Sequence, residues 1–210
     1  MNGTALTLGL SSLSLALFPL VRPYFPFDPT NPAETLAGAA PAVTSARWLI
    51  AHYLALVGFV LLVCALPALG AVSHAGCRIW VIGVGVMLIL PTLGIELYTL
   101  PAIGRLYLDG NTSVALLLRP IYLRGAAPVM LIGLVLLAVG ATILAVAMVR
   151  RNSVMPRWTV IVYAMGLALW CPLFPPIVRM IDGVLIGVGG LTLAWNLLRS
   201  TALASALPHG

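Results

Sequence analysis

The sequence predicts an all-α protein, a polytopic transmembrane helical bundle in which about six helices cross the bilayer. Of its 210 residues, 61% are hydrophobic and only 8% are charged, whereas soluble domains carry about 25% charged residues. A chain so poor in charge cannot solvate its own surface in water. Six segments of about 20 mostly apolar residues also follow one another along it, and each is long enough to span a membrane. We therefore expect one transmembrane domain over residues 1–210, with the lipid bilayer as its partner.

The predicted spans are 4–21, 47–70, 78–101, 126–149, 158–178 and 183–199. The first has the length of a signal peptide, but no Arg or Lys precedes it and no A-x-A cleavage site follows, so we expect a retained helix. The last is the shortest, and it either spans the membrane or re-enters it.

An even number of spans places both termini on one side of the membrane. The short loops on that side bring Arg78, Arg150, Arg151 and Arg157 with no acidic residue, and basic residues gather in cytoplasmic loops. The chain uses Arg without any Lys, which is typical of GC-rich bacterial coding. We therefore expect a multi-pass protein of the bacterial inner membrane with cytoplasmic termini.

Two longer loops on the outer side are predicted to contain interfacial segments. Pro32 fits the first position of a short helix over 32–40, and Glu34 fits the capping-box position. Residues 111–125 form a second apolar segment. Trp48 and Tyr122 fall near the outer ends of spans, as interfacial aromatic residues do.

The outer ends of the first, third and fifth spans resemble one another: FPLVR, PAIGRLYLDG and PPIVRMIDG. Either three helical hairpins arose by duplication, or Pro and Arg simply collect at helix ends. Arg105 with Asp109, and Arg179 with Asp182, have helical i,i+4 and i,i+3 spacing. Such pairs contribute about 0.2–0.5 kcal/mol each and are expected to position helix ends.

Glu96 lies inside the apolar stretch PTLGIELYTLP. His52 precedes the centre of the turn between the second and third spans, near His74, by 22 residues, and Glu96 follows it by 22. Equal counts along two antiparallel helices mean equal depth, so His52 is the predicted partner of Glu96. Thr92 and Thr99 are expected on the same helix face, while Arg105, Arg179 or outer water are alternative partners. The site either locks two helices together or relays protons or binds a cation.

Other chemistry lacks its sequence patterns. Cys64, Cys77 and Cys171 form no CxxC pair, as a thiol–disulfide enzyme would require. Neither HExxH, GxxxxGK[ST] nor GxSxG is present, and no catalytic residue, metal site or cofactor is expected. The arginines are spread singly, which argues against nucleic-acid binding. The Gly-rich stretches 83–94 and 183–190 predict close helix packing.

With DPTNPAETLAG, RWLIAHYLALVG and PPIVRMIDGVLIGVGGLTLAWNLLR added to the six spans, the chain resembles bacterial multi-pass membrane proteins of unknown function. This resemblance implies a membrane bundle and brings no activity with it. We expect a non-enzymatic scaffold, accessory or sensor protein. The alternatives are a small transporter or proton-coupled carrier using His52 and Glu96, and a membrane enzyme acting on lipid at the outer face. Protein partners and oligomeric state are not predicted.

Overall fold

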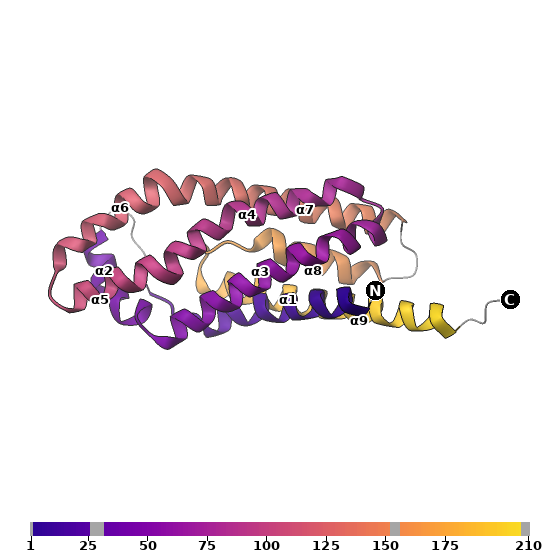
Figure 1. Cartoon of the computed structure of the whole chain (residues 1–210), viewed down its shortest axis with the longest axis horizontal. Coiled ribbons are helices and arrows are strands. Elements are labelled where there is room, and N and C mark those ends of the chain that lie inside the picture. The colour runs from indigo at the N-terminus through magenta and orange to yellow at the C-terminus, as the bar shows by residue number, and fades with distance from the viewer. Residues whose placement is uncertain (1, 26–31, 152–155, 207–210) are drawn as a thin grey trace.

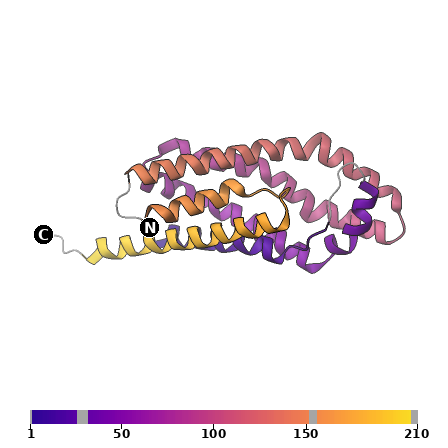
Figure 2. The ribbon, with the colours of Figure 1, turned by 180° about the vertical axis from the view of Figure 1, so that it is seen from behind.

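The computed structural model describes residues 2–25, 32–151 and 156–206, and within these ranges every regular element is helical (Figures 1 and 2). Short 3-10 turns (η1 and η3) and π turns (η2 and η4) join several helices into longer rods. The helices are α1 (Asn2–Val21), α2 (Pro32–Val43), α3 (Ala46–Ser73), α4 (Trp80–Gly94), α5 (Leu100–Leu108), α6 (Leu118–Ile121), α7 (Ala127–Arg151), α8 (Arg157–Leu169) and α9 (Pro176–Ala206); the joining turns are η1 (Gly76–Ile79), η2 (Ile95–Thr99), η3 (Thr112–Leu117) and η4 (Tyr122–Ala126).

Five stretches of the described chain are long and apolar enough to cross a membrane: Gly3–Val21, Ala46–Ser73, Gly76–Leu108, Thr112–Arg150 and Pro176–Ser200. The all-α class is therefore confirmed, and the helices fit a membrane bundle. The predicted count of six full spans is wrong by one.

The difference lies in the last two predicted spans, 158–178 and 183–199. Helix α8 stops at Leu169 after 13 residues, and α9 begins at Pro176 and continues for 31. Pro172, Pro175 and Pro176 interrupt the apolar run, because proline lacks an N–H and disfavours helix in the residue before it. At 1.5 Å per residue α8 is about 20 Å long, against about 30 Å of hydrocarbon. The short segment is thus the fifth, whereas the sixth lies within one continuous helix of 31 residues.

The third and fourth predicted spans, 78–101 and 126–149, are the middle parts of longer rods. Gly76–Leu108 has 33 residues and Thr112–Arg150 has 39, or about 50 and 60 Å at 1.5 Å per residue. Their far ends gather with α2 at one end of the molecule (Figure 1). We call α2, α5, η3 and α6 the headpiece. Its buried side chains, together with Trp48, form their own cluster: Leu36, Ala39, Ala40, Val43, Trp48, Leu100, Ile103, Val114, Ala115 and Leu118.

The headpiece includes both segments predicted in the outer loops. The short helix expected at 32–40 is present as α2. The segment 111–125 is helical too, but it runs continuously into α7 instead of forming a separate piece.

The main core is packed closely around glycines, as the Gly-rich stretches predict. A Cβ on Gly85 of α4 would lie 2.7 Å from the backbone nitrogen of Leu137 and 2.8 Å from the carbonyl oxygen of Gly133, both on α7. Gly189 of α9 meets the backbone of Tyr163 on α8 in the same way. Only glycine permits helices to approach so closely.

The beginning of α1 and the end of α9 lie at the same end of the bundle, opposite the headpiece (Figure 1). The hairpins do not repeat one another, however. One pairs rods of 33 and 39 residues, and the next pairs α8 of 13 with α9 of 31. Arg105 is exposed on the headpiece, whereas Arg179 lines an internal cavity. These differences favour the second interpretation, that prolines and arginines simply collect at helix ends.

Candidate functional site

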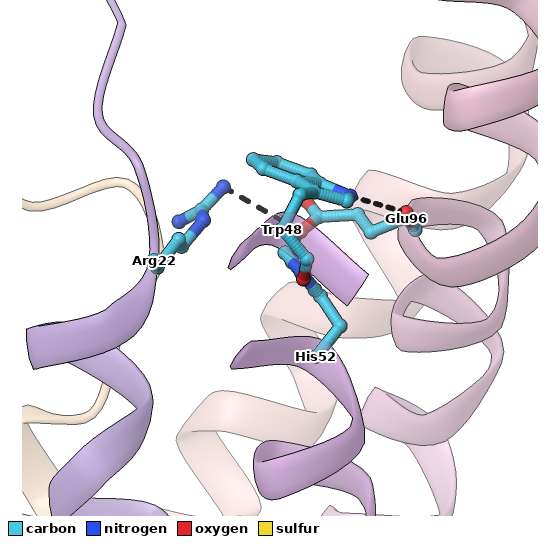
Figure 3. Close-up of polar contacts among 4 residues, drawn as sticks. All are labelled: Arg22, Trp48, His52 and Glu96. Carbon is cyan, nitrogen blue, oxygen red and sulfur yellow. Dashed lines mark hydrogen bonds and ion pairs between the residues drawn. The ribbon is translucent and has the colours of Figure 1, made fainter. Parts of the chain in front are cut away.

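The structure brings His52 of α3 and Glu96 of η2 together, with Trp48 and Arg22 beside them (Figure 3). His52 Nε2 lies 2.6 Å from Glu96 Oε2, and the other ring nitrogen, Nδ1, lies 2.7 Å from the carbonyl oxygen of Trp48. The imidazole is fully buried, and the Glu96 side chain is 12% exposed. Helix α3 ends at His74, which has the left-handed conformation with φ 53°. The turn at this residue determines that His52 and Glu96 lie at the same height.

These contacts fix the number of protons in the pair. A carbonyl oxygen only accepts, so Nδ1 of His52 must carry a hydrogen. The 2.6 Å contact between Nε2 and Oε2 then needs one further proton, held by either atom. The pair is an imidazolium with a carboxylate or a neutral imidazole with a carboxylic acid. Its net charge is zero in both cases.

Trp48 and Pro101 explain why the chain forms a π turn at Glu96. The N–H of Leu100 bonds to Ile95, and Pro101 has no N–H, so the Glu96 carbonyl has no intrahelical donor. The indole Nε1 of Trp48 donates to that carbonyl at 2.7 Å. Trp48 is completely buried, so its ring packs inside the protein and does not face lipid. Buried tryptophans usually find such an acceptor.

Arg22, directly after α1, is the arginine that meets Glu96. Its Nη2 lies 3.5 Å from Glu96 Oε2, and its guanidinium carbon lies 4.8 Å from the centre of the Trp48 ring. The residue is 8% exposed. Neither alternative named from the sequence, Arg105 or Arg179, makes this contact. The available signal was that Arg22 ends the first span at the outer end, where Glu96 was also expected.

The two predicted threonines are placed differently from each other. Thr92 is buried, donates to the carbonyl oxygen of Ala126 at 3.3 Å and lines the cavity beside Glu96. Thr99 is half-buried and is not among the residues lining that cavity. The i+3 spacing from Glu96 shares a face only in an α-helix, and the π turn shifts it.

The two predicted helix-end pairs do not form ion pairs within 4.0 Å in the described part of the chain. Arg105 and Asp109 are both exposed on the headpiece. Arg179 instead stacks on Tyr24, with its guanidinium carbon 4.5 Å from the ring centre, while Asp182 is buried. Burial raises the pKa of the Tyr24 phenol, which donates to the carbonyl oxygen of Pro19 at 2.6 Å.

A cavity of about 570 Å³ opens beside this cluster, and Arg22, Glu96 and Arg179 lie on its wall. Most of the remaining wall is apolar. The other lining residues are Pro23, Tyr24, Phe25, Thr35, Leu36, Ala39, Trp48, Thr92, Leu100, Leu118, Tyr122, Leu123, Ala127, Met130, Leu131, Pro172, Leu173, Phe174, Pro175 and Pro176.

Both arginines have more donors than the protein uses. Nε and Nη1 of Arg22, and Nε and Nη1 of Arg179, are buried with no hydrogen-bond partner among the described residues. Unpaired buried donors are costly, particularly on charged groups. The wall of the cavity therefore carries two guanidinium groups with unused hydrogen-bonding capacity.

The cavity opens at the surface of the protein near the point where α8 ends. Leu131 of α7 and Leu173 in the loop after α8 both line it, yet they are 47% and 59% exposed. Residues of the loop after α8, from Pro172 to Pro175, form part of the wall together with residues of α7 and with Pro176 and Arg179 of α9. The prolines that stop α8 therefore also leave a lateral opening with apolar edges.

In the described part of the chain, no group of three or more His, Cys, Asp or Glu residues is arranged to hold a metal ion. Comparison of the chain with protein families, curated proteins and solved structures gave no match. The class of the protein rests on its own features: an all-α fold, five helices long and apolar enough to cross a membrane, and a charged cluster at one end.

Proposed function

We propose that the protein is a non-enzymatic, multi-pass bacterial membrane protein that binds an anionic amphiphile in the cavity beneath the headpiece, in an accessory or sensor role. The observation that carries this proposal is that two arginines, the buried Arg22 and the half-buried Arg179, both line one largely apolar cavity. A cavity with apolar walls and a few converging polar groups is the usual form of a ligand site.

Charge counting supports an anionic ligand. Arg22 and Arg179 contribute two positive charges, and the His52–Glu96 pair contributes none wherever its proton resides. Asp182, on the same helix as Arg179, reduces the sum to one when it is ionised. Counted over the residues that the structure describes, the cluster is thus positive in either state of Asp182, in a region where solvent screens charges weakly.

A proton-coupled carrier is the second candidate, because the shared proton of His52 and Glu96 lies at the cavity wall. Intramembrane acids beside histidines are common in proton relays. The tightly packed core between this cluster and the other end of the bundle favours binding over transport. Acidification inside liposomes containing the purified protein, driven by an amphiphile gradient and lost in Glu96→Gln, would favour the carrier instead.

The orientation proposed with this function has both ends of the chain in the cytoplasm and the cavity near the outer surface of the membrane. An amphiphile in the outer leaflet would then meet the cavity at the depth of its own headgroup.

Binding can be tested by the thermal midpoint of the purified protein in a neutral detergent, with added single-chain amphiphiles of equal chain length and anionic, neutral or cationic headgroups. We expect stabilisation by the anionic members, of about 2.7 kcal/mol at a concentration a hundred times the dissociation constant. Arg22→Gln should reduce it, and Arg105→Gln, at an exposed arginine of the headpiece, should not. Equal stabilisation by neutral and anionic amphiphiles would refute the proposal.

A further inference from the structure

Resting on the proposed function, we infer that the ligand is a phosphate-headed lipid that enters sideways between α7 and the loop after α8. Its phosphate lies between Arg22 and Arg179, and its chain fills the space that α8 leaves by ending at Leu169.

The donors favour phosphate over carboxylate. Arg22 and Arg179 both line the cavity, and each guanidinium carries five N–H donors in a rigid fork. A carboxylate presents two oxygens, whereas a phosphate monoester presents three. The forked geometry of arginine suits phosphate oxygens, and these charge-assisted bonds are strong.

The charges agree with this headgroup. In the described part of the chain, the titratable groups near the arginines are Glu96 with its partner His52, Asp182 and the phenols Tyr24 and Tyr122. The His52–Glu96 pair is neutral overall, so the net charge of these groups is two positive charges from the arginines. It falls to one positive charge when Asp182 is ionised. Phosphate esters carry one to two negative charges near neutral pH, which matches this range.

The arginines are held ready before any ligand arrives. Arg22 lies 4.8 Å from the Trp48 ring centre, and Arg179 lies 4.5 Å from that of Tyr24. Stacking on aromatic faces restrains both guanidinium groups. Less side-chain entropy is then lost when a ligand binds.

The size and openings of the cavity suit a lipid more than a free ion. The cavity volume of about 570 Å³ is many times the roughly 30 Å³ that one water molecule takes up in the liquid, so phosphate alone would leave most of it unfilled. Leu131 and Leu173 line the cavity and are exposed, so the rest of a chain can leave through the lateral opening into the bilayer.

Native mass spectrometry of the whole protein in a neutral detergent can rank the headgroups, using lipids of equal chain length: phosphatidic acid, phosphatidylglycerol, a fatty acid, phosphatidylcholine and diacylglycerol. We expect phosphatidic acid to bind at least tenfold tighter than the fatty acid, and inorganic phosphate at the same concentration not to displace it. A fatty acid that binds equally well would overturn the phosphate assignment and leave the proposed function standing. Displacement by inorganic phosphate would overturn the lipid assignment, and binding of no anionic amphiphile would refute the proposed function itself.

Variants test the arginines and the route. Arg179→Gln, which removes no ion pair within 4.0 Å, should weaken phosphatidic acid binding at least tenfold without lowering the thermal midpoint of the lipid-free protein. Leu131→Trp should obstruct the opening and slow or weaken binding, compared with Val135→Trp one turn along α7, which is also exposed but lies outside the cavity. Unchanged binding in Arg179→Gln overturns the inference, and equal effects of the two tryptophans overturn the lateral route.

Discussion

Replacing Glu96 with leucine tests how the polar cluster is held together. The change removes the partner of two buried groups at once, His52 Nε2 at 2.6 Å and Arg22 Nη2 at 3.5 Å. His52→Leu removes only one contact of Glu96, whose carboxylate keeps Arg22. We therefore expect Glu96→Leu to be the more destabilising change.

The size of the effect follows from the burial of the pair. Breaking a buried ion pair by removing one member costs about 3–5 kcal/mol, which is the expected loss of unfolding free energy for Glu96→Leu. His52→Leu should cost about 1.5–3 kcal/mol, the range for a hydrogen bond to a charged group. The double variant leaves only Arg22 without its partner, so it should be more stable than Glu96→Leu. The resulting coupling energy is about 2 kcal/mol, within the range for residues in contact.

The measurement is equilibrium unfolding in mixed micelles of a mild detergent and sodium dodecyl sulfate, followed by far-ultraviolet circular dichroism. Glu96→Gln is the matched control, because the amide keeps the shape of the side chain and an acceptor for Arg22. Its cost should be well below that of Glu96→Leu. If the losses of the two single variants simply add in the double variant, His52 and Glu96 are not energetic partners.

Two further predictions concern packing and orientation. Gly85→Ala should lower the unfolding free energy by about 1–3 kcal/mol, as overpacking does, because its Cβ would meet the backbone of α7. Gly94→Ala on the same helix, with open space around its Cβ, should be neutral or stabilising; similar losses in both variants would exclude helix contact as the cause. Reporter fusions at His74 should report the cytoplasm, and those at Gly38 and Ser113 the outside, whereas the reverse pattern would invert the proposed orientation.

The contact between His52 and Glu96 could be reached by counting, because the hairpin that carries them is regular. Helix α3 is continuous from Ala46 to Ser73, and the turn lies at His74, so equal counts keep their meaning as equal depth. The fold class followed just as directly from the lack of charge and the length of the apolar segments.

Other parts depended on contacts between hairpins, which counting along one hairpin cannot supply. Arg22 reaches Glu96 because α1 packs beside α3, and no spacing in the sequence encodes that neighbour. The prolines from Pro172 to Pro176 are a local signal for the early end of α8. The sequence stays apolar through these prolines, so a hydropathy profile does not detect the end of the helix. The prediction placed Thr99 on the same helix face as Glu96, which holds only in an α-helix. Pro101 has no N–H and favours the π turn, in which these two residues no longer share a face.

The unused donors separate a structural lock from a binding site. A lock between two helices needs as many acceptors as donors, and His52, Trp48 and Glu96 satisfy that condition among themselves. Arg179 contributes nothing to that set, since it contacts no acid within 4.0 Å and two of its nitrogens are buried and unpaired. Keeping such a group on an apolar wall costs stability that a glutamine or methionine would recover. In the proposed function, an anion bound to Arg179 offsets that cost. The structural-lock and binding-site interpretations therefore differ most in what they predict for Arg179.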